Sequence, residues 1–270
     1  MADLPHRIAA AADSLKRSAT RFRKAPVQTP ARGPLAGMRV AVPPWLIDLD
    51  LDTEYEPDVT AALQRLVQPG FACADLGAHV GYFTLLLARL SGAAGSVVAF
   101  EASPDNARIV ERNVRLNGLD HRVSVEVAAV TDRSVDALPL YAGRTGGSME
   151  WTLDADFATR EEVGTATIEP TAEVRGVSLD EYFPPGSNLD LVKIDIEGAE
   201  AQAIPGMQRL LRDARPIVVL EFHREVGWPA IPALQEAAYS FATLEGRPLE
   251  RFRGPDEVPY QLLAEPPRGT

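Results

Sequence analysis

Cysteine is almost missing from this sequence. The 270 residues include a single cysteine, Cys73, so no disulfide can form within the chain. Cys73 lies in an apolar run that predicts a buried strand, which is typical of a small core side chain in a reducing compartment. We therefore expect a cytoplasmic protein. No group of cysteine and histidine residues has the spacing of a zinc site.

Long apolar runs are missing as well. No stretch reaches membrane-spanning length, and the first residues lack the compact apolar core of a secretory signal. We therefore expect no membrane span. The hydrophobic content of 46% in 270 residues is enough for one α/β domain of ordinary size with an extension.

Basic residues are scarce outside the N-terminal part. Residues 1–40 carry a net charge of +6 and the remainder carries −17, which gives −11 for the whole chain. An acidic body repels phosphates, so we expect no nucleic-acid partner. We interpret residues 1–37 as a basic N-terminal extension and residues 38–270 as the folded domain. For the extension two interpretations stay open, a frayed terminal segment or a contact with a partner or a membrane surface.

The first motif of the folded domain is a strand, a glycine turn and a helix over residues 73–84. Asp75 precedes Gly77, and Gly81 follows four positions later. We expect Gly77 to let the backbone approach a ligand and Gly81 to let the helix pack close to the strand. The spacing differs from the G-x-G-x-x-G of dinucleotide sites. It suits a ligand with a carboxylate and an ammonium group but no phosphate, and S-adenosylmethionine fits that description.

A second motif follows at the next expected strand. Residues 96–101 form a short apolar run that ends in Glu101, where a carboxylate of a βαβ unit binds the hydroxyls of a ribose. An exposed acid at a strand end is the alternative. Ser103 is placed to cap a helix that begins at Pro104 and stops near Asn117.

The middle of the chain is irregular. Arg122–Val130 alternates as a third strand, and residues 131–188 then form a long section that we interpret as an inserted cap. Short strands are expected at 166–169 and 173–177. Trp151 lies inside this section and either contacts an acceptor or only packs against its neighbours.

The fourth core strand carries ionisable residues where a central strand is usually apolar. Along residues 189–200, the side chains of Lys193, Asp195 and Glu197 are expected to share one face. Parallel strands covered on both faces are normally apolar on both. Such a departure marks a functional site or, in the alternative interpretation, a pair of charges that neutralise each other.

The fifth expected strand, residues 216–223, ends in Glu221 and His223. His223 is either exposed and unspecialised or part of the acceptor side of a site. Residues 241–244 and 260–263 predict an antiparallel edge of the sheet. Residues 47–52 alternate leucine or isoleucine with aspartate, which predicts a half-exposed strand, and the acids up to Asp58 then form its solvated face.

Taken together, these segments resemble the FkbM family of methyltransferases, over about residues 38–225. The resemblance implies a class I S-adenosylmethionine-dependent fold, which is a doubly wound, Rossmann-like α/β domain with a mostly parallel sheet. It also implies O-methylation, often of sugars or polyketide-type natural products. His79 stands where the family more often has asparagine. The segments that carry the resemblance are Asp75–Thr84, Phe100–Pro104, Asn117–Leu119, Val177–Asp180 and Val192–Glu200.

We expect the cofactor to lie along the first two motifs. Gly77, Ala78 and Gly81 are assigned to the methionine end and Asp75 to its ammonium group, with Glu101 on the ribose. The region that begins at Ala129 is expected beside the adenine. The complete set of expected cofactor-binding residues is Asp75, Gly77, Ala78, His79, Gly81, Glu101, Ala102, Ser103 and Ala129.

The acceptor is expected to be a small molecule, in some cases glycosylated, and its hydroxyl must lose a proton. His223 is the first choice of base and Asp195 the second, with Lys193 orienting the acceptor or stabilising an alkoxide. The alternative is a divalent cation such as Mg²⁺ held by Asp195, Glu197, Glu221 and His223, which is not favoured. Two rival functions remain, a nicotinamide-dependent oxidoreductase and a catalytically silent S-adenosylmethionine-binding module.

Overall fold

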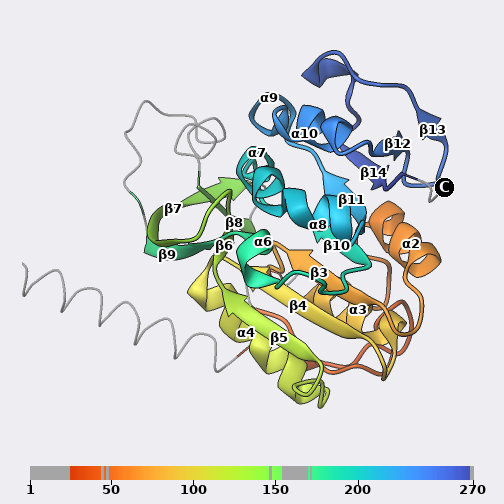
Figure 1. Ribbon diagram of the computed structural model, residues 1–270. Coiled ribbons are helices and arrows are strands. Elements are labelled where there is room, and N and C mark those ends of the chain that lie inside the picture. Colours follow the sequence, from red (N-terminus) through yellow and green to blue (C-terminus); the bar gives the residue numbers. More distant parts are fainter. Residues whose placement is uncertain are drawn as a thin grey trace, which may run out of the picture.

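Eight strands form the main sheet of the described part of the chain (Figure 1). The computed structural model describes residues 25–43, 46, 49–145, 148–153, 170 and 172–267. In the sheet order the strands are β13 (Pro248–Leu249), β12 (Ser240–Ala242), β14 (Gln261–Glu265), β11 (Ile217–Glu221), β10 (Leu191–Ile194), β3 (Ala72–Leu76), β4 (Ser96–Glu101) and β5 (Val123–Val127).

The directions of these strands confirm the predicted fold class. The five strands from β11 to β5 are parallel to one another. β14, β12 and β13 join them as an antiparallel edge. The expected strands at 241–244 and 260–263 are therefore present, with bounds shifted by one or two residues.

Helices cover both faces of the main sheet, and the strands supply apolar side chains to each face in turn. Leu191 and Val219 pack in the cluster that contains α2 (Pro57–Leu66), α3 (Tyr82–Ser91) and α4 (Pro104–Leu116). Val192 and Val218 pack in the opposite cluster. That cluster is covered by α6 (Leu179–Tyr182), α7 (Glu200–Ala203), η2 (Ile204–Met207), α8 (Gln208–Asp213) and α10 (Ala230–Glu236).

Local sequence explains where helix α4 begins. The hydroxyl of Ser103 accepts a hydrogen bond from the backbone N–H of Asn106 at 3.4 Å, and Pro104 occupies the first helical position. A serine cap followed by proline is a strong start signal, because it satisfies a free N–H and removes another. The helix ends with Asn117 at its C-terminal cap, as predicted.

The middle section folds as a second sheet beside the main one (Figure 1). Its order is β6 (Ala129–Val130), β9 (Ala172–Val177), β7 (Val135–Thr145) and β8 (Ser148–Thr152). The expected third strand at 122–130 is corrected here, because it breaks at Ala128: its first part pairs with β4 and its last two residues pair with β9. The short strand expected at 166–169 lies outside the described residues.

The N-terminal part of the described chain packs against the core. β1 (Val27–Gln28) pairs with β2 (Val40–Ala41), and Leu35 is fully buried in the first cluster. The domain start at residue 38 stays a prediction. The half-exposed strand expected at 47–52 is not formed by residues 49–52, which lie in a loop and turn. Residues 47 and 48 lie outside the described part.

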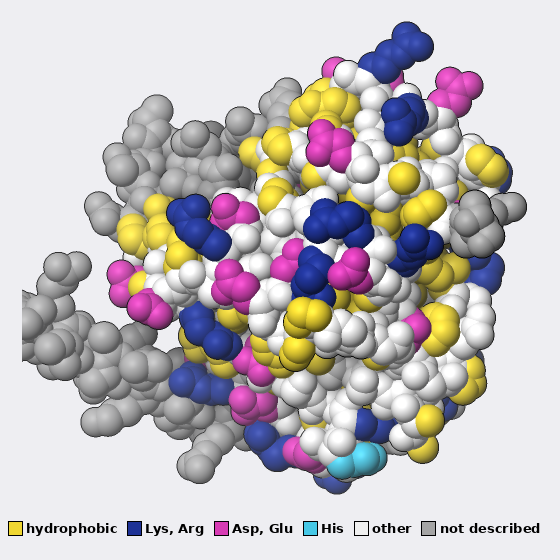
Figure 2. All heavy atoms as spheres, viewed as in Figure 1, with side chains coloured by type: hydrophobic (Ala, Val, Ile, Leu, Met, Phe, Trp, Pro, Cys, Tyr) yellow, Lys and Arg dark blue, Asp and Glu magenta, His cyan; other side chains and the backbone are white. Residues whose placement is uncertain are grey.

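The surface seen in Figure 2 carries lysine and arginine side chains with aspartate and glutamate side chains between them. On this face the basic side chains therefore do not form a continuous area. Among the described helices, none is long and apolar enough to cross a membrane. The remaining short elements are α9 (Arg224–Gly227) and η3 (Pro255–Glu257).

Candidate active site

A cavity of about 310 Å³ opens at the carboxyl ends of β3, β4, β10 and β11. Ligands of open α/β sheets bind at this edge, and the volume lies near the lower limit of small-molecule pockets. Side chains of the inserted sheet close one side of the cavity with apolar groups. The charged residues of its lining are Glu56, Glu101, Lys193, Asp195, Glu197 and Glu221. With carboxyl groups in such excess, the cavity favours a positively charged ligand.

The glycine turn after β3 forms one wall of the cavity. Gly77 has φ +80°, and a Cβ built on it would lie 1.7 Å from the carbonyl oxygen of Asp195. This glycine therefore permits a close approach to the chain after β10, and because Gly77 also lines the cavity, the expected approach to a ligand stays a prediction. The expectation that Gly81 lets its helix pack close to the strand is corrected. A Cβ at Gly81 would meet Val110 of α4 at 3.1 Å and not a strand.

Glu101 lies at the end of β4 and lines the cavity, as expected for a ribose ligand. Its Oε2 accepts a hydrogen bond from the backbone N–H of His79 at 2.7 Å, and its Oε1 accepts one from Ser103 at 2.8 Å. Burial raises its pKa to about 7 although these bonds oppose the shift. A carboxylate offers about four acceptor positions, and besides these two backbone groups the side chain of Asn106 also binds Glu101, so one position remains for a ligand hydroxyl.

Three of the expected cofactor-binding residues stand behind the cavity wall and do not line it. Asp75 is fully buried, where its Oδ2 accepts a hydrogen bond from the hydroxyl of Thr84 at 2.6 Å. Its assignment to a ligand ammonium group is therefore corrected. Ser103 is buried as the cap of α4, and Gly81 packs on Val110. Those that do line the cavity are Gly77, Ala78, His79, Glu101, Ala102 and Ala129.

His79 is a polar side chain of the cavity wall without a protein partner at one nitrogen. Its backbone has φ +51°, and its Nε2 makes no hydrogen bond to the described residues. Burial lowers its pKa to about 4, so the ring is neutral at physiological pH. A neutral imidazole is able to donate to a ligand or accept from it, as an asparagine amide does.

The Lys193–Asp195 pair lines the cavity next to the glycine turn. The Nζ of Lys193 is 3.1 Å from Oδ2 of Asp195, 3.8 Å from Oδ1 of Asp75 and 3.4 Å from the carbonyl oxygen of Gly77. Burial alone would lower the pKa of Lys193, but the surrounding carboxylates, with Asp195 first, outweigh it and raise the pKa. Lys193 is therefore a fixed positive charge that holds the carboxylate of Asp195 in place.

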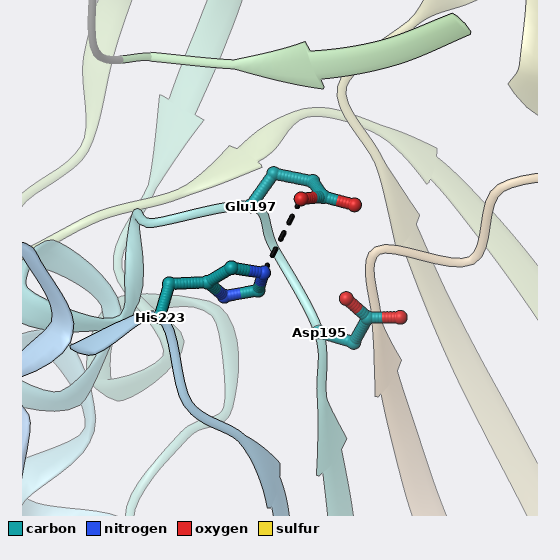
Figure 3. Close-up of side chains that lie close together, drawn as sticks. All are labelled: Asp195, Glu197 and His223. Atoms are coloured by element: carbon teal, nitrogen blue, oxygen red, sulfur yellow. Dashed lines mark ion pairs between the residues drawn. The ribbon is translucent and has the colours of Figure 1, made fainter. Parts of the chain in front are cut away.

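Beyond Asp195 the chain leaves the strand geometry that the alternation predicts. β10 ends at Ile194, and Glu197 has φ +50° in the turn that follows. The expectation that Lys193, Asp195 and Glu197 share one face of a strand is wrong for Glu197. Its carboxylate turns toward His223 instead, with Oε2 3.3 Å from Nε2 (Figure 3).

His223 lies among carboxylates. Its Nδ1 is 2.8 Å from Oε1 of the fully buried Glu200, and its Nε2 is 3.3 Å from Glu197 and 3.8 Å from Glu221. Burial lowers the pKa of His223, but hydrogen bonds to Glu197 and Glu200 outweigh it and raise the pKa to about 11. A protonated imidazole has no lone pair to receive a proton. The first choice of base is therefore corrected, and Asp195 is better placed.

Glu56 is a residue of the site that the sequence analysis missed. It caps α2 with φ +43° and lines the cavity, and its Oε2 has no hydrogen-bond partner among the described residues. Burial raises its pKa to about 7. The sequence places it in a run of acids that resembles a solvated face. Its position before Pro57, at the start of a helix, is the one local signal that sets it apart.

Comparison with known proteins identifies a methyltransferase family and relatives within it or similar to it. The family model described as Methyltransferase FkbM domain matches residues 75–241, which is more than half of the chain. Methyltransferase sdnD of Sordaria araneosa is 28% identical over 184 residues, covering 60% of this chain and 70% of that protein. Methyltransferase 1 of Beauveria bassiana is 26% identical over 203 residues, covering 71% and 79%.

Solved structures are also similar. The methyltransferase FkbM from Methylobacillus flagellatus KT matches with a TM-score of 0.47 and 14% identity, over 76% of this chain. The match covers 50% of that protein, so this chain spans half of its length. A SAM-dependent O-methyltransferase from Thermotoga maritima matches with a TM-score of 0.43 and 15% identity, over 82% of this chain and 68% of that one.

Proposed function

The chain belongs to the FkbM family of S-adenosylmethionine-dependent methyltransferases, and we propose that it methylates a hydroxyl group of a sugar or another natural-product small molecule. The observation that carries the proposal is the placement of two carboxylates in one cavity. Glu101 lines it at the end of β4, and the Lys193–Asp195 pair lines it at the end of β10. One group is suited to holding a cofactor and the other to acting on an acceptor.

The charge and polarity of the cavity suit S-adenosylmethionine. Its sulfonium and ammonium groups are cations, and carboxylates dominate the charged lining. Beside its bonds to His79, Ser103 and Asn106, Glu101 retains an acceptor position for a ribose hydroxyl. Ala129, Val130 and Leu140 give an apolar surface for an adenine ring. The same carboxylates oppose the pyrophosphate of a nicotinamide cofactor, which supports the methyltransferase over the oxidoreductase.

S-adenosylmethionine supplies an electrophilic methyl group on a positively charged sulfur. The protein then has to position an acceptor oxygen in line with that methyl group and favour the loss of its proton. We assign the activation of the acceptor hydroxyl to Asp195, which is partly exposed to the cavity while its Oδ2 is fixed by Lys193. His223 binds Glu197 beside Asp195 and is not assigned the role of base.

The test combines cofactor binding with methyl release. We expect calorimetry to detect S-adenosylmethionine binding, and mass spectrometry to detect O-methylated products from a panel of glycosides and other hydroxylated natural products. Asp195→Asn should lower turnover by about a hundredfold or more, with cofactor affinity within about threefold of wild type. Asp213→Asn, which makes the same change at an exposed position of α8, is the matched control.

Three results would overturn the proposal. Methylation of amines, with hydroxyl acceptors left unchanged, would assign another acceptor class. Cofactor binding without turnover on any acceptor would favour the silent binding module. Binding of NAD in preference to S-adenosylmethionine would favour the oxidoreductase.

A further inference from the structure

Asp195 and Glu197, which line the cavity, and the neighbouring His223 bring three ligand atoms together (Figure 3). One atom from each side chain lies within 4.8 Å of the other two. Atoms that share an ion at about 2.0–2.2 Å lie roughly 3 to 4 Å apart. The three side chains therefore need to close by only about 1 Å to share an ion.

The orientation of His223 is fixed from behind by a fourth residue. Glu200 is fully buried, and its Oε1 lies 2.8 Å from Nδ1 of the histidine. This contact directs Nε2 toward Glu197 and the cavity. Histidines that bind metals almost always donate their other N–H to a carboxylate or carbonyl, which fixes the tautomer and the plane of the ring. Glu200 is such a partner, independent of the three ligand atoms.

The surrounding charges favour a cation at this point. The carboxylates of Glu197, Glu200 and Glu221 face the imidazole and together stabilise a positive charge beside it. A metal ion at Nε2 would replace the proton there and be stabilised by the same carboxylates. Among the described residues that line the cavity, the cationic side chain is Lys193, which binds Oδ2 of Asp195 and leaves Oδ1 as the oxygen for an ion.

We propose that Asp195, Glu197 and His223 bind a divalent cation that holds the hydroxyl oxygen of the acceptor. The donor set has one imidazole and two carboxylates, which suits a first-row ion such as Mn²⁺ better than Mg²⁺, whose sites are built from oxygen. Glu221, one of the residues expected from the sequence, lies outside this group of three ligand atoms. Its oxygens accept hydrogen bonds from the hydroxyl of Tyr260 and the side-chain amide of Gln261.

The cation deepens the proposed function and rests on it for its purpose. It gives Asp195 the means to activate the acceptor, because an oxygen bound to a metal ion loses its proton more easily. In the transfer, the acceptor oxygen forms a bond to the methyl carbon and the bond from that carbon to sulfur breaks. The sulfur keeps the electron pair as a neutral thioether, and the hydroxyl proton passes to Asp195 and from there to water.

The experiment measures metal binding apart from catalysis. Purified full-length protein, freed of metals by chelation, is titrated with Mn²⁺ and the free ion is followed by electron paramagnetic resonance. We expect one Mn²⁺ per chain in the wild type. Asp195→Asn and Glu197→Gln should each weaken binding by at least about tenfold, as loss of a ligand does. Asp213→Asn should bind as the wild type does.

A second readout keeps the result clear if a variant is unstable. Circular dichroism reports whether each variant is folded, and His223→Gln is included because glutamine keeps a polar group beside Glu200. Absence of stoichiometric Mn²⁺ in folded wild-type protein would overturn the site. Binding that none of the three substitutions weakens would do so as well.

Methyl release in the presence of a chelator separates the two proposals. Turnover that continues in the chelator would remove the cation and leave the methyltransferase. Stoichiometric Mn²⁺ binding without methylation of any hydroxyl acceptor would retain the metal site and remove the proposed function. Turnover lost in the chelator and restored by Mn²⁺ would support both.

Discussion

The two ends that we propose for the cavity, a cofactor end at Glu101 and an acceptor end at Asp195, are held in different ways. At the cofactor end, the oxygens of Glu101 are fixed by backbone N–H groups of His79 and Ser103. At the acceptor end, Asp195, Glu197 and His223 are fixed by other side chains, chiefly Lys193 and Glu200. Backbone donors keep their positions when neighbouring side chains change, whereas a network of ionised side chains shifts as a unit.

This difference bears on what each end does. A cofactor binds in the same way in every turnover, so a rigid frame that follows the chain path is sufficient. The acceptor end has to stabilise charge that appears only during the reaction, and buried ionised groups provide that. Substitutions at the cofactor end should therefore affect affinity, and substitutions at the acceptor end should affect turnover.

The largest effect is expected where the two ends touch. Gly77 lies between them, and a Cβ there would overlap the carbonyl oxygen of Asp195 at 1.7 Å. Gly77→Ala should destabilise the protein by about 2 to 5 kcal/mol, from left-handed strain and from overpacking. Urea unfolding measures the change.

Gly186→Ala is the matched control for the glycine. Gly186 has φ +83°, and a Cβ there would meet nothing within 4 Å. It carries the strain without the overlap, so it should cost only about 1 to 2 kcal/mol. Equal losses in the two variants would show that the ends of the cavity do not depend on a close contact at Gly77.

A smaller effect is expected from substituting Glu101, the residue that we propose binds the ribose. Glu101→Ala should weaken S-adenosylmethionine binding by about ten- to a hundredfold, because hydrogen bonds to a charged acceptor contribute about 1.5–3 kcal/mol. Turnover at saturating cofactor should stay near that of the wild type. Calorimetry and steady-state kinetics measure the two quantities.

Glu101→Gln provides a check on folding in that experiment. The amide oxygen still accepts from one of the two backbone N–H groups that Glu101 binds. The variant should therefore be more stable than Glu101→Ala while it still loses affinity. A normal affinity in both variants would remove Glu101 from the cofactor site.

The fold around Glu101 is also the part that the sequence predicts best. Glu101 follows an apolar run, and Ser103 and Pro104 mark the start of the next helix by local chemistry alone. The parallel order of the central strands follows from the alternation of strands and helices. These features depend on neighbours in the chain, so a single sequence contains the information for them.

The acceptor end depends on contacts that are distant in the chain. Residues 192–197 alternate as far as Glu197, and nothing in that pattern marks the end of β10 at Ile194. His223 is an ordinary histidine until Glu197 and Glu200 are placed against it. Glu56 enters the cavity only because α2 packs on α3. Tertiary packing determines the end of β10, the surroundings of His223 and the position of Glu56. Residue types and spacing alone therefore do not predict them.

The smallest expected effect is a pH dependence that separates the two ends once more. Burial gives free Glu101 a pKa of about 7, and ribose hydroxyls should stabilise its ionised form and lower that pKa in the complex. Binding then releases a proton, so cofactor affinity should rise with pH up to about 7 and level off above it. Between pH 8 and pH 6 the affinity should fall by at most about tenfold, while His79, with a pKa of about 4, stays neutral.

Glu56 also has a pKa of about 7, so calorimetry over this range should compare Glu101→Gln with Glu56→Gln. If the dependence of cofactor affinity on pH is lost in Glu101→Gln, the titrating group belongs to the cofactor end. If it is lost only in Glu56→Gln, this prediction is contradicted.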